Sequence, residues 1–112
     1  MRIYHNPRCR KSRETLQIIK EMGHEPQIIE YLKEPPSADE IVGFLDKMDM
    51  KPEDLIRKGE LLYRKEYKGK TMRDEEWIEA MIKNPVLIER PIVISGDRVV
   101  LGRPSERVRD IL

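Results

Sequence analysis

The chain has 112 residues and a mass of 13.3 kDa, which is enough for one domain with a single core. Its 22 basic and 21 acidic residues leave a net charge of +1, which argues against non-specific nucleic-acid binding because such binding needs a basic excess. We find no apolar run near the roughly 18 residues of a membrane span and no apolar stretch typical of a secretory signal. One cysteine cannot form an intramolecular disulfide. We therefore expect a cytoplasmic, single-domain protein that spans residues 1–112.

The first third of the chain predicts a β-α-β unit. Residues 2–5 are β-prone and alternate in polarity, and Asn6-Pro7 ends this strand. Apolar side chains recur at helical spacing in residues 11–22, and Gly23 is placed to end the helix. Residues 27–31 predict a second strand, whose lack of clean alternation is typical of a strand covered on both faces. The two strands should be parallel.

The middle of the chain predicts short helices. Ser37 and Glu40 have the spacing of a capping box, which opens a helix. Pro52 is placed at the first position of a short helix. Asp74 could cap a further helix that runs to residue 83. Residues 59–72 are polar and predict no element.

The last part of the chain predicts a β-hairpin and a closing helix. Residues 91–94 and 98–101 are β-prone runs around a turn that contains Gly96, and residues 104–112 favour a helix. Pattern alone supports one α/β domain. The order β-α-β, helical insertion at approximately 37–83, β-β-α is that of a thioredoxin-like fold, with a mixed sheet flanked by helices.

Cys9 lies between the first strand and the first helix, within residues 5–13. Backbone N–H groups of the first helical turn and the helix dipole would lower the pKa of its thiol. A hydroxyl hydrogen bond from Ser12 would act in the same direction. Four cations are also close in sequence: Arg8, Arg10, Lys11 and Arg13. A free cysteine can instead be a small buried residue in a strand-helix corner, but these basic and polar neighbours favour a reactive thiol.

The same position would bind an oxyanion, because unpaired amides at a helix start combine with arginines to form an anion site. A tyrosine-phosphatase loop needs Cys-x5-Arg, whereas position 15 is Thr15. A dithiol oxidoreductase needs Cys-x-x-Cys, whereas the place of the second cysteine is taken by Ser12. Any second thiol must therefore come from another molecule.

Five motifs, which run from end to end of the chain, resemble the glutaredoxin-like arsenate reductase (ArsC) family. They are Ile3-Tyr4-His5-Asn6-Pro7-x-Cys9-x-x-Ser12-Arg13-x-Thr15-Leu16, Glu25-Pro26 to Leu32 with Pro35-Pro36, Leu55-Ile56-Arg57-Lys58, Asn84-Pro85-Val86-Leu87-Ile88-Glu89-Arg90-Pro91-Ile92-Val93, and Gly102-Arg103-Pro104-Ser105-Glu106.

The resemblance implies that Cys9 attacks arsenate and that Arg57, Arg90 and Arg103 surround the oxyanion. In this family glutathione, as co-substrate, reduces the arsenic adduct to arsenite, and a glutaredoxin resolves the mixed disulfide. The single cysteine fits this chemistry because each resolving thiol is borrowed. We assign no bound cofactor and no metal, and we expect a monomer.

Further site residues follow from the resemblance. His5 matches a histidine that tunes the nucleophile, although a structural histidine bonding the loop fits the sequence as well. Arg90-Pro91 would be a cis peptide that faces the cysteine. Arg10 stands where arsenate-reducing members typically carry glycine, and it could add an anion contact. Each arginine could also be an ordinary surface charge.

Two other functions remain open. One is a glutathione-dependent thiol oxidoreductase that acts on substrates other than arsenate. The other is a regulatory binding protein, because some family members bind RNA polymerase and sense redox state through a Cys-x-x-Cys switch. Ser12 argues against such a switch in this chain.

Overall fold

The computed structural model describes all residues, 1–112, and divides into two compact units. The first unit contains residues 1–34 and 90–112, and the second contains residues 35–89. The whole β-sheet belongs to the first unit, whereas the second is helical. The helical segment expected at 37–83 lies inside the second unit.

The sheet has four strands: β1 (Arg2–His5), β2 (Gln27–Glu30), β3 (Ile92–Ser95) and β4 (Arg98–Leu101). Their order is β2-β1-β3-β4. β1 and β2 are parallel, as predicted, and the other two pairs are antiparallel. In the β3–β4 hairpin Gly96 has a φ of 60°, a left-handed conformation that glycine adopts without steric cost. The α/β class and the mixed sheet are confirmed.

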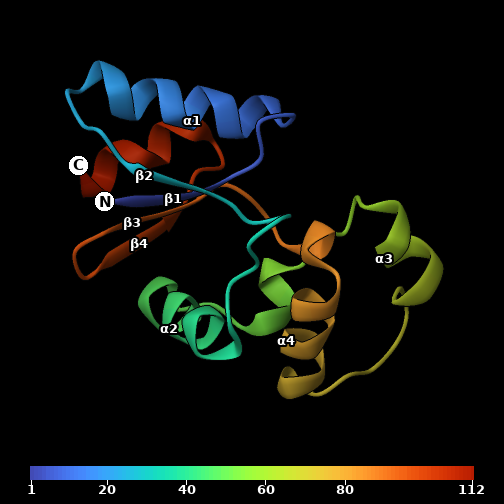
Figure 1. Cartoon of the computed structure of the whole chain (residues 1–112). Helices are drawn as coiled ribbons and strands as arrows, with labels where there is room; N and C mark the ends of the chain where they lie inside the picture. Colours follow the sequence, from blue (N-terminus) through green and yellow to red (C-terminus); the bar gives the residue numbers. More distant parts are fainter. The chain divides into compact units, whose positions relative to one another are not determined.

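Two helical segments cover one face of this sheet, namely α1 (Arg10–Glu21) and η3, a 3-10 helix at Ser105–Ile111. Figure 1 shows them, in blue and red, lying together over the strands. The core beneath them takes one fully buried side chain from each of β1, α1, β3 and η3: Ile3, Ile19, Val93 and Val108. Burial of these side chains holds α1 on the sheet.

The prediction that the second strand is covered on both faces is wrong. β2 is an edge strand that pairs only with β1. Ile28 is 45% exposed, Gln27 is exposed and Ile29 is only partly buried. The absence of alternation therefore reflects an edge position, where neither face is fully covered.

The second unit contains α2 (Ala38–Met48), η1 (Pro52–Leu55), α3 (Leu61–Glu66), α4 (Asp74–Lys83) and η2 (Pro85–Leu87). The predicted capping box is confirmed: the Glu40 N–H donates to Ser37 Oγ at 3.1 Å, and the Ser37 N–H donates to Glu40 Oε1 at 3.0 Å. Pro52 opens η1, also as predicted.

The predicted cap of α4 is wrong by one residue. Arg73 is the N-cap, and its N–H donates to Glu76 Oε1 at 3.0 Å, whereas Asp74 is already helical. α3 had no sequence prediction, because none of its residues is buried and no apolar stripe marks it.

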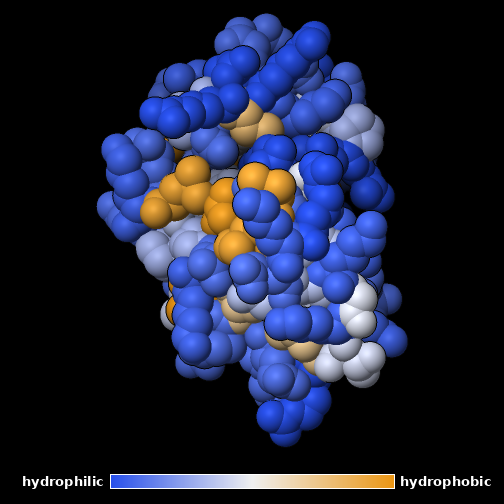
Figure 2. Space-filling view, turned by 90° about the vertical axis from the view of Figure 1, so that its right-hand side faces the viewer, coloured by the Kyte–Doolittle hydropathy of each residue, from blue (hydrophilic) through white to orange (hydrophobic).

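Charged side chains dominate the surface. Figure 2 shows a mainly hydrophilic face that carries a small group of hydrophobic side chains. None of the helices combines the length and the apolar content that a membrane crossing requires.

Candidate active site

Cys9 is the N-cap residue of α1 and is 9% exposed. Two hydrogen bonds to Asn6 shape the loop before it: the Cys9 N–H donates to the Asn6 carbonyl, and the Arg8 N–H donates to the side-chain Oδ1 of Asn6, both at 3.0 Å. The Arg13 N–H then donates to the Cys9 carbonyl at 3.0 Å and begins the helix. The sulfur is therefore fixed at the positive end of a 12-residue helix.

The pKa of the Cys9 thiol is lowered. Burial alone would raise this pKa, but the Ser12 backbone N–H, the Arg90 guanidinium and the Lys11 backbone N–H all stabilise the thiolate and outweigh it. The Arg90 side chain acts both by its charge and by a hydrogen bond to the sulfur. The sequence predicted the lowered pKa and its backbone source, but it attributed the charge to cations next to Cys9 in the chain.

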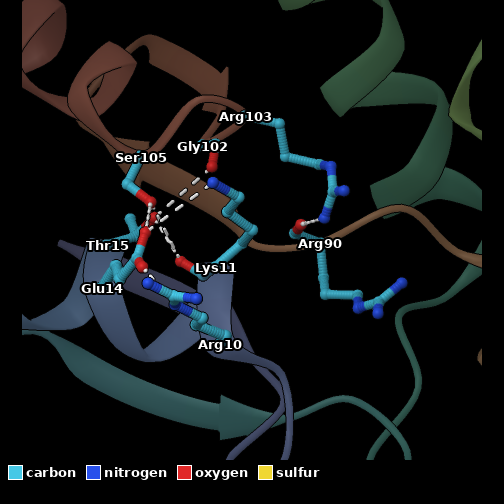
Figure 3. Close-up of polar contacts among 8 residues, drawn as sticks. All are labelled: Arg10, Lys11, Glu14, Thr15, Arg90, Gly102, Arg103 and Ser105. Carbon is cyan, nitrogen blue, oxygen red and sulfur yellow. Dashed lines mark hydrogen bonds and ion pairs between the residues drawn. The ribbon is translucent and has the colours of Figure 1, made fainter.

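Arg90 and Arg103 lie together in the first unit. Arg90 is 5% exposed and precedes β3 through a cis Arg90–Pro91 peptide, which confirms the predicted cis bond. Arg103 Nη1 donates to the Arg90 carbonyl at 3.4 Å (Figure 3). A second cis peptide, Arg103–Pro104, was not predicted. Arg90 thus acts directly on Cys9, and Arg103 contacts the backbone of Arg90.

Arg57 belongs to the second unit. Its Nη1 lies 3.0 Å from Glu60 Oε2, and its side chain is 35% exposed. Its backbone N–H donates to the Leu87 carbonyl at 2.7 Å, which ties the segment after η1 to η2. The structure therefore shows an ion pair, and the role of Arg57 as an anion ligand stays a prediction.

The Ser12 hydroxyl contacts His5 and not the cysteine. His5 is 6% exposed, and its Nδ1 lies 2.6 Å from Ser12 Oγ, which also accepts the Asn6 N–H at 3.0 Å. The expected hydroxyl contact with the thiolate is thus replaced by a contact from the Ser12 backbone.

The imidazole of His5 is uncharged near neutral pH. Burial lowers its pKa, the charges of Arg13 and Lys20 lower it further, and Glu30 opposes them without reversing the shift. Any effect of His5 on the nucleophile therefore passes through its hydrogen bond with Ser12, and not through a positive charge.

Arg10 points away from the cysteine loop. Its side chain is 84% exposed, and its Nε donates to Glu14 Oε1 at 2.9 Å (Figure 3). In this structure Glu14 holds the guanidinium, and a contact between Arg10 and an anion stays a prediction.

One group of residues at the site had no role in the sequence analysis. Thr15 is fully buried, and its hydroxyl lies 2.9 Å from the Lys11 carbonyl and 3.5 Å from the Gly102 carbonyl. A Cβ on Gly102 would lie 2.7 Å from Thr15 Oγ1 and 3.0 Å from Pro91 Cγ. Gly102 is thus needed for close packing. The only signal in the sequence was the Gly-Arg-Pro motif itself.

An ionised sulfur beside a buried guanidinium can attack an electrophilic centre and bind the negative charge around it. No cluster of three or more His, Cys, Asp or Glu side chains is arranged to hold a metal ion. Fold and site together define a thioredoxin-like protein with one activated cysteine.

Comparison with known proteins identifies the family. The ArsC family model matches residues 4–111, and the chain belongs to this family. It is 41% identical to the Escherichia coli K12 protein YfgD, described as uncharacterized, over the whole chain and 96% of that protein. It is 42% identical to an arsenate reductase from Acidiphilium multivorum, over 98% of this chain and 79% of the relative. The solved arsenate reductase from Vibrio cholerae superposes with a TM-score of 0.94 at 39% identity, covering 99% of this chain and 96% of that one.

Proposed function

We propose that this chain reduces arsenate to arsenite, with Cys9 as the nucleophile, glutathione as co-substrate and a glutaredoxin as the recycling partner. The observation that carries the proposal is the contact between the Arg90 guanidinium and the Cys9 sulfur, which lowers the pKa of the thiol. Family membership and relatives named arsenate reductase support arsenate as the substrate.

The first step is attack of the Cys9 thiolate on arsenic. A sulfur–arsenic bond forms, one arsenic–oxygen bond breaks, and the departing oxygen takes up protons and leaves as water. Arg90 and Arg103 would bind the remaining oxygens, because forked guanidiniums match a tetrahedral dianion and stabilise charge that shifts onto its oxygens.

The second step reduces the arsenic. The glutathione sulfur attacks the Cys9 sulfur, and the electron pair of the sulfur–arsenic bond stays on arsenic, which becomes As(III) and leaves as arsenite. Cys9 and glutathione are left as a mixed disulfide. A glutaredoxin thiol takes the glutathione sulfur and restores the Cys9 thiolate. In sum, arsenate and two thiols give arsenite, one disulfide and water.

Each of the remaining candidate residues has a role that rests on a single observation. Arg57 is retained as an anion ligand on its sequence motif alone. His5 would orient the Ser12 turn as a neutral hydrogen-bonding partner. Pro91 would shape the backbone at Arg90 through its cis bond.

Arg10 favours a second candidate function, a glutathione-dependent oxidoreductase that does not act on arsenate. It occupies the position directly after the nucleophile, where arsenate-reducing members typically carry glycine, and it is highly exposed. An exposed guanidinium at that position could pair with a carboxylate of glutathione.

Arsenite formation in the presence of glutathione and a glutaredoxin tests the proposal. We expect the wild-type protein to release arsenite and the Cys9→Ser variant to release none. A low-molecular-weight glutathione mixed disulfide serves as the alternative substrate in a parallel assay. Reduction of this disulfide without arsenite formation would replace the proposed function by the second candidate.

A further inference from the structure

We propose that Glu14 and Ser105 are positioning residues, which fasten the loop that carries Arg103 to the helix that carries Cys9. This inference rests on the proposed function, because it assigns Arg103 to the oxyanion. It adds two residues, 91 positions apart in sequence, that do not touch the anion themselves.

Ser105 is buried, at 2% exposure, and sits at the start of η3. Its Oγ lies 3.0 Å from Glu14 Oε2 and 3.3 Å from the Lys11 carbonyl, both on α1 (Figure 3). The hydroxyl has one proton to donate, and a carboxylate is the stronger acceptor of the two. Ser105 therefore links η3 to α1 at a point just after Cys9.

A second anchor lies on the other side of Arg103. Gly102 packs against Thr15 of α1 with no room for a Cβ, and its N–H donates to the Pro91 carbonyl at 2.9 Å. Arg103 is thus held between two fixed points, Gly102 and Ser105. Its guanidinium reaches the Arg90 carbonyl in this conformation, 3.4 Å away.

Glu14 is itself held in place by Arg10 at 2.9 Å and by Lys11 at 3.9 Å. The Ser105 hydroxyl, above all, lowers the pKa of the Glu14 carboxyl, and Arg10 and Lys11 contribute to the same shift. The carboxylate therefore stays ionised, and a good acceptor, at neutral pH. The exposed Arg10 acquires a role here as the residue that orients Glu14.

A positioning role predicts a specific pattern of effects. Loss of the Glu14–Ser105 contact should let the Arg103 loop move and weaken anion binding. It should leave the pKa of the Cys9 thiol unchanged, since that pKa depends on Arg90 and on the backbone of α1. A merely structural role would instead disturb anion binding and the thiol together, because both depend on α1.

The test compares Ser105→Ala, Glu14→Ala and Glu14→Gln with Glu21→Ala, an exposed acid on the same helix that contacts only Gln17. The first readout is the arsenate concentration that half-protects Cys9 from iodoacetamide. We expect it to rise roughly three- to tenfold in Ser105→Ala and Glu14→Ala, the range that loss of one hydrogen bond gives. Glu14→Gln should stay near wild type, because its amide oxygen still accepts the Ser105 hydroxyl. The midpoint pH of alkylation should be constant throughout.

Turnover gives the second readout, in which KM for arsenate should rise and kcat should hold. The positioning role would be overturned if arsenate protected Cys9 equally well in all variants. It would also be overturned if the midpoint pH of Cys9 alkylation shifted in Ser105→Ala and Glu14→Ala. If arsenate protects Cys9 of the wild-type protein but no arsenite forms, the proposed reduction is wrong. The positioning role is then decided only by how the variants change the arsenate concentration that half-protects Cys9. Absence of any wild-type protection would overturn both.

Discussion

The Nδ1 atom of His5 lies 2.6 Å from the Oγ atom of Ser12. The same oxygen accepts the Asn6 N–H, so both flanks of the cysteine loop meet at one buried hydroxyl. Ser12 thereby separates two tasks: its side chain binds the end of β1, and its backbone N–H stabilises the Cys9 thiolate.

Ser12→Ala should destabilise the protein and leave the Cys9 thiol acidic. The substitution leaves the buried His5 nitrogen and the Asn6 N–H without their partner, which costs about 1–3 kcal/mol. The backbone N–H that stabilises the thiolate is retained. Urea unfolding and iodoacetamide titration measure the two effects, and a strongly raised thiol pKa in a folded variant would show that the hydroxyl acts on the sulfur after all.

Stability should fall below about pH 6.5 in a manner that depends on His5. Its pKa in the folded protein is lowered from 6.5, so the unfolded chain binds the extra proton first. The neutral imidazole therefore contributes its full stabilisation above pH 6.5. This contribution is lost as the pH falls towards the pKa that His5 has in the folded protein. Urea midpoints at several pH values measure the effect.

His5→Gln supplies the control for that measurement, because glutamine is polar and does not titrate. His24→Gln is the matched substitution of the second histidine, which lies in the partly exposed segment after α1. A pH dependence that survives in His5→Gln would assign it to another group.

Gly102→Ala should destabilise the first unit by about 1–3 kcal/mol, the usual effect of overpacking. The new Cβ would lie 2.7 Å from Thr15 Oγ1, and the buried threonine has little freedom to move. Gly43→Ala is the matched control. Its Cβ meets nothing within 4 Å, and in the middle of α2 alanine should stabilise by roughly 0.5–1 kcal/mol. Equal unfolding midpoints for the two variants would contradict the packing argument.

Arg90→Ala and Arg103→Ala should weaken arsenate binding far more than Arg98→Ala. Arg90 acts on the Cys9 sulfur and Arg103 contacts the Arg90 carbonyl, whereas Arg98 is an exposed hairpin residue whose Nη1 donates to the Asp110 carbonyl. Protection of Cys9 by arsenate measures all three variants in one assay. Comparable weakening by Arg98→Ala would undercut the assignment of the anion site. Arg57→Ala belongs in the same series and tests the prediction made from its motif.

Local patterns predicted most of the fold. The capping box at Ser37, the proline that opens η1 and the hairpin glycine all act within a few residues, so their effect can be predicted from the sequence directly. The exposure of β2 could not be predicted, because Ile28 looks the same in an edge strand as in a central one. Its environment depends on strands and helices that are distant in sequence.

The candidate site divides in the same way. Position at a helix start predicted the backbone contribution to the Cys9 pKa, since those N–H groups follow it in sequence. The charge contribution comes from Arg90, 81 positions later, and only a family resemblance pointed there. The Glu14–Ser105 contact had no signal at all, because a common surface acid and a serine become partners only once η3 lies on α1.

The most direct measurement is the titration of Cys9 by iodoacetamide against pH, in the wild-type protein and in Arg90→Ala. The chain has one cysteine, so alkylation reports on this thiol alone. We expect a wild-type midpoint clearly below the value of about 8.5 for a free cysteine, and a higher midpoint in Arg90→Ala. A wild-type midpoint at or above that value, or one that Arg90→Ala leaves unchanged, would contradict an activated thiolate held by Arg90.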